Sequence, residues 1–488
     1  MNSLKPKSLK LNAFLNSLRS LLTVVFPLIT FPYVSRVLSI DGIGKYNFSS
    51  SVVSYFLLIA GLGINTYAIR EGAKYRDNKQ MIGPFINQMF TINVMSAVVS
   101  YILLFMCLII FSKLHSYLLC ILIYSIQIGF SVISVDWVFT IYEDFVYITI
   151  RNIIFQLISV ALLFVFVRHS GDYLNYATIT VFSAVGSNVL NFYKASNLFK
   201  IKLTFNFNWK IHLIPILLLF AANIANMINV SSDITILGLL KNDYIVGIYS
   251  ISSKIYYIIN NTLAAVLLVT VPRLAMLFGK KMMREYIKLF RRLINILFIL
   301  TIPAMVGLIL LSRQVILIVA GNHFLRSVSS LQILAVANIF AILAWALSDC
   351  VLIPAKREKY VLRGIIISAF SNIIINITLI PYFSEIAAAI GTVVAEIVVF
   401  SFNYYYSRDI VKNIFISRNT VNTIFSTSIG CIGIIVICLM LSSIIKNIIL
   451  ETILAVSLSV IVYGVILIFL NNSYALSIFN QMKEKLHI

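Results

Sequence analysis

The feature that most constrains this chain is a series of long apolar stretches along almost its whole length. A helix needs about 20 consecutive apolar residues to cross the hydrocarbon layer of a bilayer. An all-α polytopic membrane protein is therefore expected. The sequence predicts fourteen spans, near residues 12–34, 46–67, 84–110, 117–140, 147–167, 174–194, 212–237, 248–270, 291–311, 329–352, 361–381, 386–406, 422–443 and 448–470.

The composition excludes several other classes of protein. Hydrophobic residues make up 60% of the 488 positions and charged residues only 11%, against about 45–50% and about 25% in soluble domains. A cytosolic enzyme, a secreted disulfide scaffold and a disordered chain are all excluded. The five cysteines lie in apolar stretches without a CxxC motif, so we expect them to be small buried hydrophobic residues rather than metal ligands or disulfides. No metal site or cofactor is predicted.

The net charge of +21 is explained by topology. Cytoplasmic loops of membrane proteins collect Lys and Arg. With the N-terminus inside and fourteen spans, 27 of the 38 Lys and Arg residues fall in cytoplasmic segments and eight in outer segments. The opening MNSLKPKSLK is not followed by a cleavage site. Both termini are therefore predicted to be cytoplasmic, and basic charge scattered between apolar spans does not indicate nucleic-acid binding.

The two halves of the chain resemble each other. A shift of 203 residues aligns Gly44 with Gly247, and the same shift aligns neighbouring Tyr, Ser and Arg residues. A shift of 213 aligns Asp136 with Asp349 and Tyr147 with Tyr360, and a shift of 205 aligns Gly186 with Gly391. Two parallel six-helix repeats, a known transporter plan with the substrate site between the repeats, are expected. The predicted parts are residues 1–210, residues 211–415, and two further spans with a cytoplasmic tail in 416–488.

Polar residues within the spans gather on coherent helix faces. Such residues are costly in a bilayer and face a cavity or another helix. Helix–helix hydrogen bonding is one reading of these faces, and a water-filled cavity that binds substrate is the other. The candidate cavity residues are Asn12, Asn16 and Arg19 on the first span, Asn223, Asn226 and Asn229 on the seventh, and Lys254 and Tyr257 on the eighth.

Three cations, Arg19, Arg151 and Lys254, and four acids lie at membrane depth. Arg19 and Lys254 facing a cavity would suit an anionic headgroup, because Arg binds phosphate with two parallel hydrogen bonds. The acids are Asp136, Asp233, Asp349 and Glu396. One reading pairs Asp136 with Arg151 and Asp233 with Lys254, and the other makes the acids a proton or sodium coupling site.

Four segments resemble one known family. The first covers residues 27–78 and begins PLITFPYVSRVLSIDGIGKYNFSSSVVSYF, and the second covers residues 136–167 and begins DWVFTIYEDFVYITIR. The second is similar to the pattern DWFFQG-E---YI--R of bacterial polysaccharide repeat-unit flippases, except that Thr140 and Ile141 replace its Gln-Gly pair. Residues 233–255 and 387–400 resemble the seventh-to-eighth helix junction and the twelfth helix of these proteins. The family is the Wzx-type flippases of the multidrug/oligosaccharidyl-lipid/polysaccharide exporter superfamily.

The resemblance implies a V-shaped, two-lobed, alternating-access carrier in the bacterial inner membrane. It also implies an undecaprenyl-diphosphate-linked oligosaccharide as substrate, moved to the outer leaflet for O-antigen or capsule assembly, with polymerase or assembly proteins as further partners. In that reading Arg19 and Lys254 would meet the diphosphate and the Asn residues would meet the glycan. Two alternatives stay open: a cation-coupled multidrug or small-molecule antiporter of the same superfamily, and a polyprenyl-dependent polymerase or glycosyltransferase. The transporter prediction makes the chain a non-enzyme.

Overall fold

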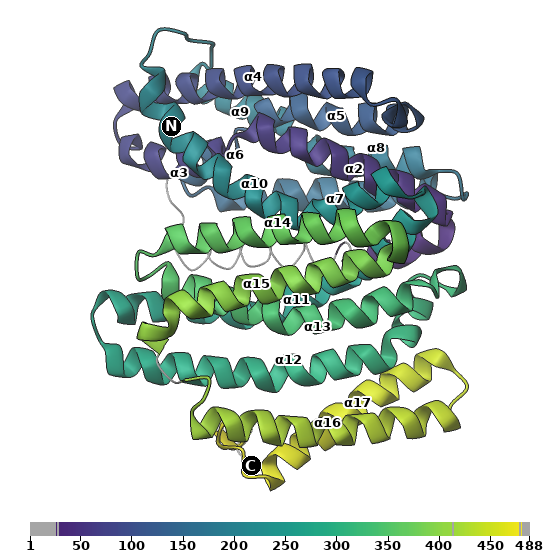
Figure 1. Ribbon diagram of the computed structural model, residues 1–488. Helices are drawn as coiled ribbons and strands as arrows, with labels where there is room; N and C mark the ends of the chain where they lie inside the picture. The colour runs from purple at the N-terminus through teal and green to yellow at the C-terminus, as the bar shows by residue number, and fades with distance from the viewer. Residues whose placement is uncertain (1–25, 27–28, 412–413, 478–479, 481–488) are drawn as a thin grey trace. The chain divides into compact units, whose positions relative to one another are not determined.

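The computed structural model describes residue 26 and residues 29–411, 414–477 and 480, and all regular structure in this part is helical (Figure 1). Residues 29–37 are helical and precede α2. Short 3₁₀ turns lie at Ser112–Tyr117 and Asn322–Phe324, and a π-helix lies at Ser348–Leu352. The α-helices are α2 (Ile40–Gly61), α3 (Ile64–Tyr75), α4 (Lys79–Ile110), α5 (Leu118–Val132), α6 (Asp136–Ile141), α7 (Phe145–Phe166), α8 (Tyr173–Val185), α9 (Asn188–Phe199), α10 (Trp209–Leu240), α11 (Asp243–Gly279), α12 (Met283–Val319), α13 (Ser327–Leu347), α14 (Glu358–Phe383), α15 (Glu385–Val411), α16 (Arg418–Ile444) and α17 (Ile448–Phe469).

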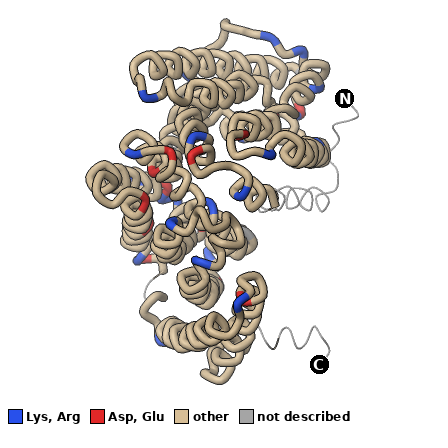
Figure 2. Tube along the Cα trace, turned by 90° about the vertical axis from the view of Figure 1, so that its right-hand side faces the viewer, with Lys and Arg blue, Asp and Glu red and all other residues tan. Residues whose placement is uncertain are grey.

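The predicted all-α membrane protein is confirmed. Within the described residues, twelve helical segments are long and apolar enough to cross a bilayer. They correspond to twelve of the fourteen predicted spans. The span predicted at 174–194 is divided between α8 and α9, and most of the span predicted at 12–34 lies outside the described residues. Charged residues are sparse along the tube (Figure 2).

The division of 361–406 into two spans is also confirmed. α14 ends at Phe383 and α15 begins at Glu385, so a single residue separates them. Ser384 takes a φ of 52°, a conformation that reverses the chain and that non-glycine residues adopt infrequently. The two helices pack against each other along their length (Figure 1).

The first compact unit runs from Met1 to Gly247. Its helix α2 packs against α4, α5 and α10. The Ser51 hydroxyl donates to the backbone oxygen of Ser231 on α10 at 3.0 Å, so α10 belongs to this unit. The compact unit extends to Gly247, and the boundary that the sequence analysis placed at residue 210 stays a prediction. A core of buried apolar side chains from α3, α4, α6 and α7 includes Ile86, Met89 and Phe139.

The second compact unit runs from Ile248 to Ile488. Helix α12 packs against α13 on one side and against α16 and α17 on another. The Tyr463 hydroxyl of α17 donates to the backbone oxygen of Ile299 on α12 at 2.8 Å. The last two spans, expected as a separate part in 416–488, thus share a core with α12. Four of the cysteines are buried as expected, Cys120 in the first unit and Cys350, Cys431 and Cys438 in the second, and all five are free.

Matching hydrogen bonds in the two units support the predicted internal repeat. Tyr46 bonds Thr180 at 3.2 Å, and Tyr249 bonds Thr392 at the same distance. The tyrosines are related by a shift of 203, as predicted. The threonines are related by 212, which also relates the first residues of α8 and α15. The shift that relates α8 to α15 is therefore 212 rather than 205. Gly186 and Gly391, which a shift of 205 relates, are not equivalent.

A helix-ending turn is repeated in equally close detail. In the first unit the Asp144 amide donates to the backbone oxygen of Phe139, and Glu143 has a φ of 57°. A shift of 213 gives Arg357, which donates to the backbone oxygen of Leu352, and Lys356, with a φ of 59°. This left-handed turn is a common helix ending. Both turns lead directly into the next helix, α7 or α14.

Candidate functional site

The predicted site residues do not all lie where they can be described. Asn12, Asn16 and Arg19 fall outside the described residues. Lys254 and Tyr257 lie on α11 in the second unit. The pairing of Asp233 with Lys254 would join the two units and stays a prediction. The remaining candidates lie on α10 of the first unit: Asn223 and Asn229 are half-buried, Asn226 is exposed and Asp233 is buried.

The predicted pairing of Asp136 with Arg151 is confirmed. Asp136 opens α6, and Arg151 lies on the second turn of α7. Both terminal nitrogens of Arg151 donate to Oδ1 of Asp136 at 3.1 Å. The Arg151 side chain is only 4% exposed, so it depends on this carboxylate. Asn191 of α9 also donates to Asp136 and to the backbone oxygen of Ser134.

Two further predicted acids, Asp349 and Glu396, lie in the second unit and have neutral partners. Asp349 lies in the π-helix and accepts a hydrogen bond of 2.7 Å from the Trp345 indole. Glu396 of α15 accepts one of 3.5 Å from the Tyr256 hydroxyl. Both a protonated and an ionised carboxyl group can accept such hydrogen bonds. Their coupling role therefore stays a prediction.

A second cation, Lys194, lies near Arg151; the sequence analysis placed it at the cytoplasmic end of the span predicted at 174–194 and not among the site residues. Lys194 is on α9, one turn beyond Asn191. Its Nζ lies 3.2 Å from the carboxylate of Asp144 and 3.5 Å from the centre of the Tyr147 ring. The spacing of Asn188, Asn191 and Lys194, three residues apart each time, places all three on one helix face. That spacing is the signal by which the sequence could have revealed Lys194.

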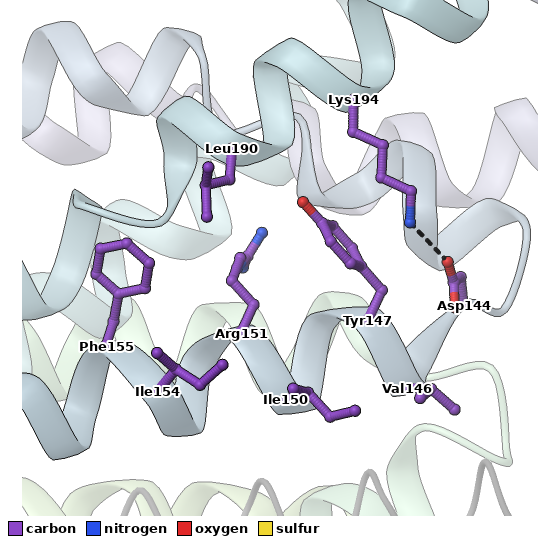
Figure 3. A pocket seen from close by; sticks show the side chains of 9 residues that line it. All are labelled: Asp144, Val146, Tyr147, Ile150, Arg151, Ile154, Phe155, Leu190 and Lys194. Carbon is purple, nitrogen blue, oxygen red and sulfur yellow. Dashed lines mark hydrogen bonds and ion pairs between the residues drawn. The ribbon is translucent and has the colours of Figure 1, made fainter.

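A pocket of about 440 Å³ lies between α7 and α9, and its polar lining consists of Asp144, Tyr147, Arg151 and Lys194. Tyr147 stands between Arg151 and Lys194, and a dashed line joins Lys194 to Asp144 (Figure 3). Lys194 is 31% exposed, which makes it the more accessible of the two cations. The rest of the lining is apolar, from Val146, Ile150, Ile154, Phe155 and Leu190. The pocket thus places two cations against an apolar wall.

The second unit carries an ion pair at the equivalent place, with the charges exchanged. Arg357 precedes α14 as Asp144 precedes α7. It bonds both carboxylate oxygens of Asp409, near the end of α15, at 2.7 and 2.6 Å. The Asp409 carboxylate raises the pKa of the Arg357 guanidinium, so this residue stays charged. In the part of the chain that is described, no group of three His, Cys, Asp or Glu side chains could hold a metal ion.

The fold defines a class, the polytopic membrane proteins. The chain is similar to a solved structure of the lipid II flippase MurJ in the inward closed conformation, with a TM-score of 0.74 at 16% identity over 93% of this chain and 98% of that one. It is also similar to an inward-facing multidrug resistance MATE family transporter of the MOP superfamily, with a TM-score of 0.56 at 15% identity over 81% and 99%.

Sequence comparison gives the family. Residues 9–278, more than half of the chain, match the family model described as "Polysaccharide biosynthesis protein". The chain therefore belongs to this polysaccharide biosynthesis protein family. A Shigella dysenteriae protein named "Putative O-antigen transporter" is 22% identical over 386 residues, covering 78% of this chain and 94% of that protein. An Escherichia coli K12 protein of the same name is 23% identical over 148 residues, 30% and 36% of the two chains. These proteins are transporters by name, and the predicted non-enzymatic class is confirmed.

Proposed function

We propose that this protein moves undecaprenyl-diphosphate-linked oligosaccharide repeat units from the cytoplasmic to the outer leaflet of the bacterial inner membrane by alternating access. The product would serve O-antigen or capsule assembly. Membership of the polysaccharide biosynthesis family, the O-antigen transporter names of the relatives and the flippase-like fold support this proposal. Polymerase or assembly proteins would be its protein partners.

The observation that carries the proposal is the cationic, apolar-walled pocket between α7 and α9. A prenyl diphosphate joins a strongly anionic group to a hydrocarbon tail. Lys194 uses one of its three donors on Asp144 and so keeps donors for a phosphate oxygen. The apolar residues of α7, among them Ile150 and Ile154, offer a surface to the first isoprene units. Asp144 would hold Lys194 in place until the phosphate arrives.

Arg151 would contribute mainly to the electrostatic potential of the pocket. Its terminal nitrogens are held by Asp136 and its Nε is buried without a hydrogen-bond partner in the described structure. Arg19 and Lys254 remain proposed contacts of the diphosphate at other stages of transport. Asp233, Asp349 and Glu396 remain the proposed proton or sodium coupling residues, since Asp136 is occupied by Arg151.

The two rival functions fit this pocket less well. An antiporter of cationic drugs would need excess acid in its cavity, whereas the lining of this pocket holds one acid, Asp144, and two cations, Arg151 and Lys194. A polymerase or glycosyltransferase would need a reactive acid or base at the site, whereas the acid of this pocket, Asp144, is paired with Lys194. The similarity to MATE transporters concerns the fold alone.

Transport by Lys194 variants tests the proposal. In proteoliposomes loaded with lipid-linked repeat units, we expect Lys194→Ala to lower the translocation rate about tenfold or more, because a charge-assisted contact to phosphate is lost. Lys194→Arg should retain much of the rate. Asp144→Asn, which removes the ion pair and keeps the cation, should transport at or above the parental rate.

The control for Lys194→Ala is Lys113→Ala. Lys113 is an exposed lysine of the same unit whose Nζ donates to the backbone oxygen of Leu239. Parental rates in both Lys194→Ala and Lys113→Ala would overturn the headgroup site. An absence of transport by the parent protein would overturn the function itself.

A further inference from the structure

A second cavity in the first unit lies where three helical segments are interrupted. α2 gives way to α3 at Leu62 and Gly63, which have φ values of 46° and 78°. α5 and α6 are separated at residues 133–135, and α8 and α9 at residues 186–187. Interrupted helices at membrane depth are tolerated where they line a cavity, and they mark substrate sites in transporters. Residues within or directly beside these three interruptions line one cavity of about 290 Å³.

The lining of this cavity is polar but uncharged. It contains four side-chain amides, two hydroxyls and an indole, together with apolar residues, and it contains no Asp, Glu, Lys or Arg. The cationic pocket between α7 and α9 has the opposite character. The polar lining residues are Asn65, Asn93, Gln127, Ser131, Ser134, Asn188 and Trp137.

Two of these side chains are buried, and one of them has an unused hydrogen-bonding atom. Asn93 is 9% exposed, and its Nδ2 donates to the backbone oxygen of Ser131, while its Oδ1 has no partner in the described structure. Trp137 is 6% exposed, and its ring lies edge-on to the Phe85 ring. A buried polar group without a partner is costly. A ligand that supplies a donor to Asn93 would remove this cost.

We propose that this cavity binds a neutral sugar residue of the cargo, an inference that rests on the proposed function. Sugar hydroxyls both donate and accept, which is what side-chain amides and hydroxyls require. The indole of Trp137 supplies a flat apolar surface with one polar edge. A hydrocarbon chain would leave the amides unsatisfied, and a phosphate would meet no cation here.

Hydrogen bonds connect the lining of this sugar site to Arg151, which lines the cationic pocket between α7 and α9. Ser134 lines the cavity, and its backbone oxygen accepts from Asn191. Asn191 in turn donates to Asp136, the partner of Arg151. Helix α9 contributes Asn188 to one pocket and Lys194 to the other. One amphipathic ligand could therefore present its phosphate and its sugar to neighbouring surfaces of the same helix.

The test compares two lipids in detergent-solubilised protein: undecaprenyl diphosphate, and the lipid-linked repeat units extracted from the cells that make this protein. We expect the parent to bind the glycan-bearing lipid more tightly. Asn93→Leu should lower the affinity for that lipid about tenfold and leave the affinity for undecaprenyl diphosphate unchanged. Trp137→Phe, which keeps an aromatic ring and removes the N–H, should lower it about fivefold.

A third variant fills the cavity without removing a hydrogen bond. Gly61 lines the cavity, and a Cβ added there meets no atom within 4 Å. Gly61→Leu should therefore exclude the sugar and leave the lipid headgroup bound. Gly83→Leu is its matched control, because Gly83 also faces open space but lies outside the lining. Asn47→Leu is the control for Asn93→Leu, since the Asn47 amide bonds the backbone of its own helix.

Each outcome decides the inference. Equal losses for both lipids in Asn93→Leu and Gly61→Leu would show a structural or headgroup role and overturn the sugar site, as would no loss for either lipid. Losses that appear for both lipids only when sodium is present would show an ion site and overturn it also. A parent that binds neither lipid would overturn the proposed function, and the sugar site with it.

Discussion

At the scale of single residues, the pair of Asp136 and Arg151 shows how a charge is kept inside an apolar protein. Arg151 is almost fully buried on α7. Removing an ion from water is costly unless a partner and further hydrogen bonds replace the solvent. Asp136 and Asn152 supply the hydrogen bonds of its terminal nitrogens. The pair therefore fixes α6, which contributes to the uncharged cavity, against α7, which lines the cationic pocket.

Breaking this pair from one side should be costly. We expect Arg151→Gln to lower the free energy of unfolding by about 3 kcal/mol, because Asp136 then loses its counter-charge. Adding Asp136→Asn to that variant should restore much of the loss. Thermal unfolding of the two single variants and the double variant in detergent measures the coupling between the residues. Strictly additive losses would contradict the pairing.

At the scale of elements, the internal repeat is preserved in geometry more than in residue identity. The turns before α7 and α14 have the same backbone hydrogen bonds. The ion pairs that hold them have exchanged charges, Asp144 with Lys194 and Arg357 with Asp409. An ion pair can be reversed without changing the distance it spans, so selection on the turn does not fix which residue is the acid. The shift of 213 that aligns Tyr147 with Tyr360 also aligns Asp144 with Arg357, although these two residues carry opposite charges.

The repeat also predicts where two helices must approach closely. Gly44 of α2 lies against the carbonyl group of Asp243, and Gly247 of α11 lies against the carbonyl group of Ile40. Both glycines and both contacted residues are related by the shift of 203 that the sequence predicted. A Cβ at either glycine would overlap with backbone atoms, which cannot move aside as a flexible side chain can. The contact is reciprocal, as expected for two equivalent helix starts.

Alanine at these glycines tests this contact. We expect Gly44→Ala and Gly247→Ala each to lower stability by about 1–3 kcal/mol, the usual cost of overpacking. Gly307→Ala on α12 is the control, since a Cβ there meets no atom within 4 Å and alanine favours the helix. Thermal unfolding in detergent provides the measurement. A Gly44 variant as stable as the Gly307 variant would contradict the close approach.

At the scale of the whole molecule, the distribution of charge predicts which loops face the cytoplasm. The basic loops at 76–79 and 280–282 belong to the predicted cytoplasmic segments, whereas the loop at 168–172 belongs to the predicted outer segments. In a variant without native cysteines, Ser170→Cys should react with a membrane-impermeant maleimide in intact cells. Lys281→Cys should react only after the membrane is opened. Labelling of both residues in intact cells would contradict the predicted orientation.

The sequence by itself determined the membrane class, twelve of the spans and the repeat. These follow from the length of apolar runs and the recurrence of Gly44 and Tyr46 at a fixed shift, and both can be read along the chain without its tertiary structure. The pairing of Asp136 with Arg151 was also within reach, because the two residues are close in sequence. It was one of two open readings until the structure placed both side chains.

Only the tertiary structure decided the site. Lys194 ends the sixth predicted span and is followed by several further lysines. Its contacts with Tyr147 and Asp144 depend on how α9 packs near α7. The uncharged cavity depends on three interruptions in helices far apart in the sequence. Loop length and helix packing place these residues, and neither leaves a local pattern. An apolar run specifies that a helix crosses the bilayer, but its rotation and its neighbours are set by packing against the other helices.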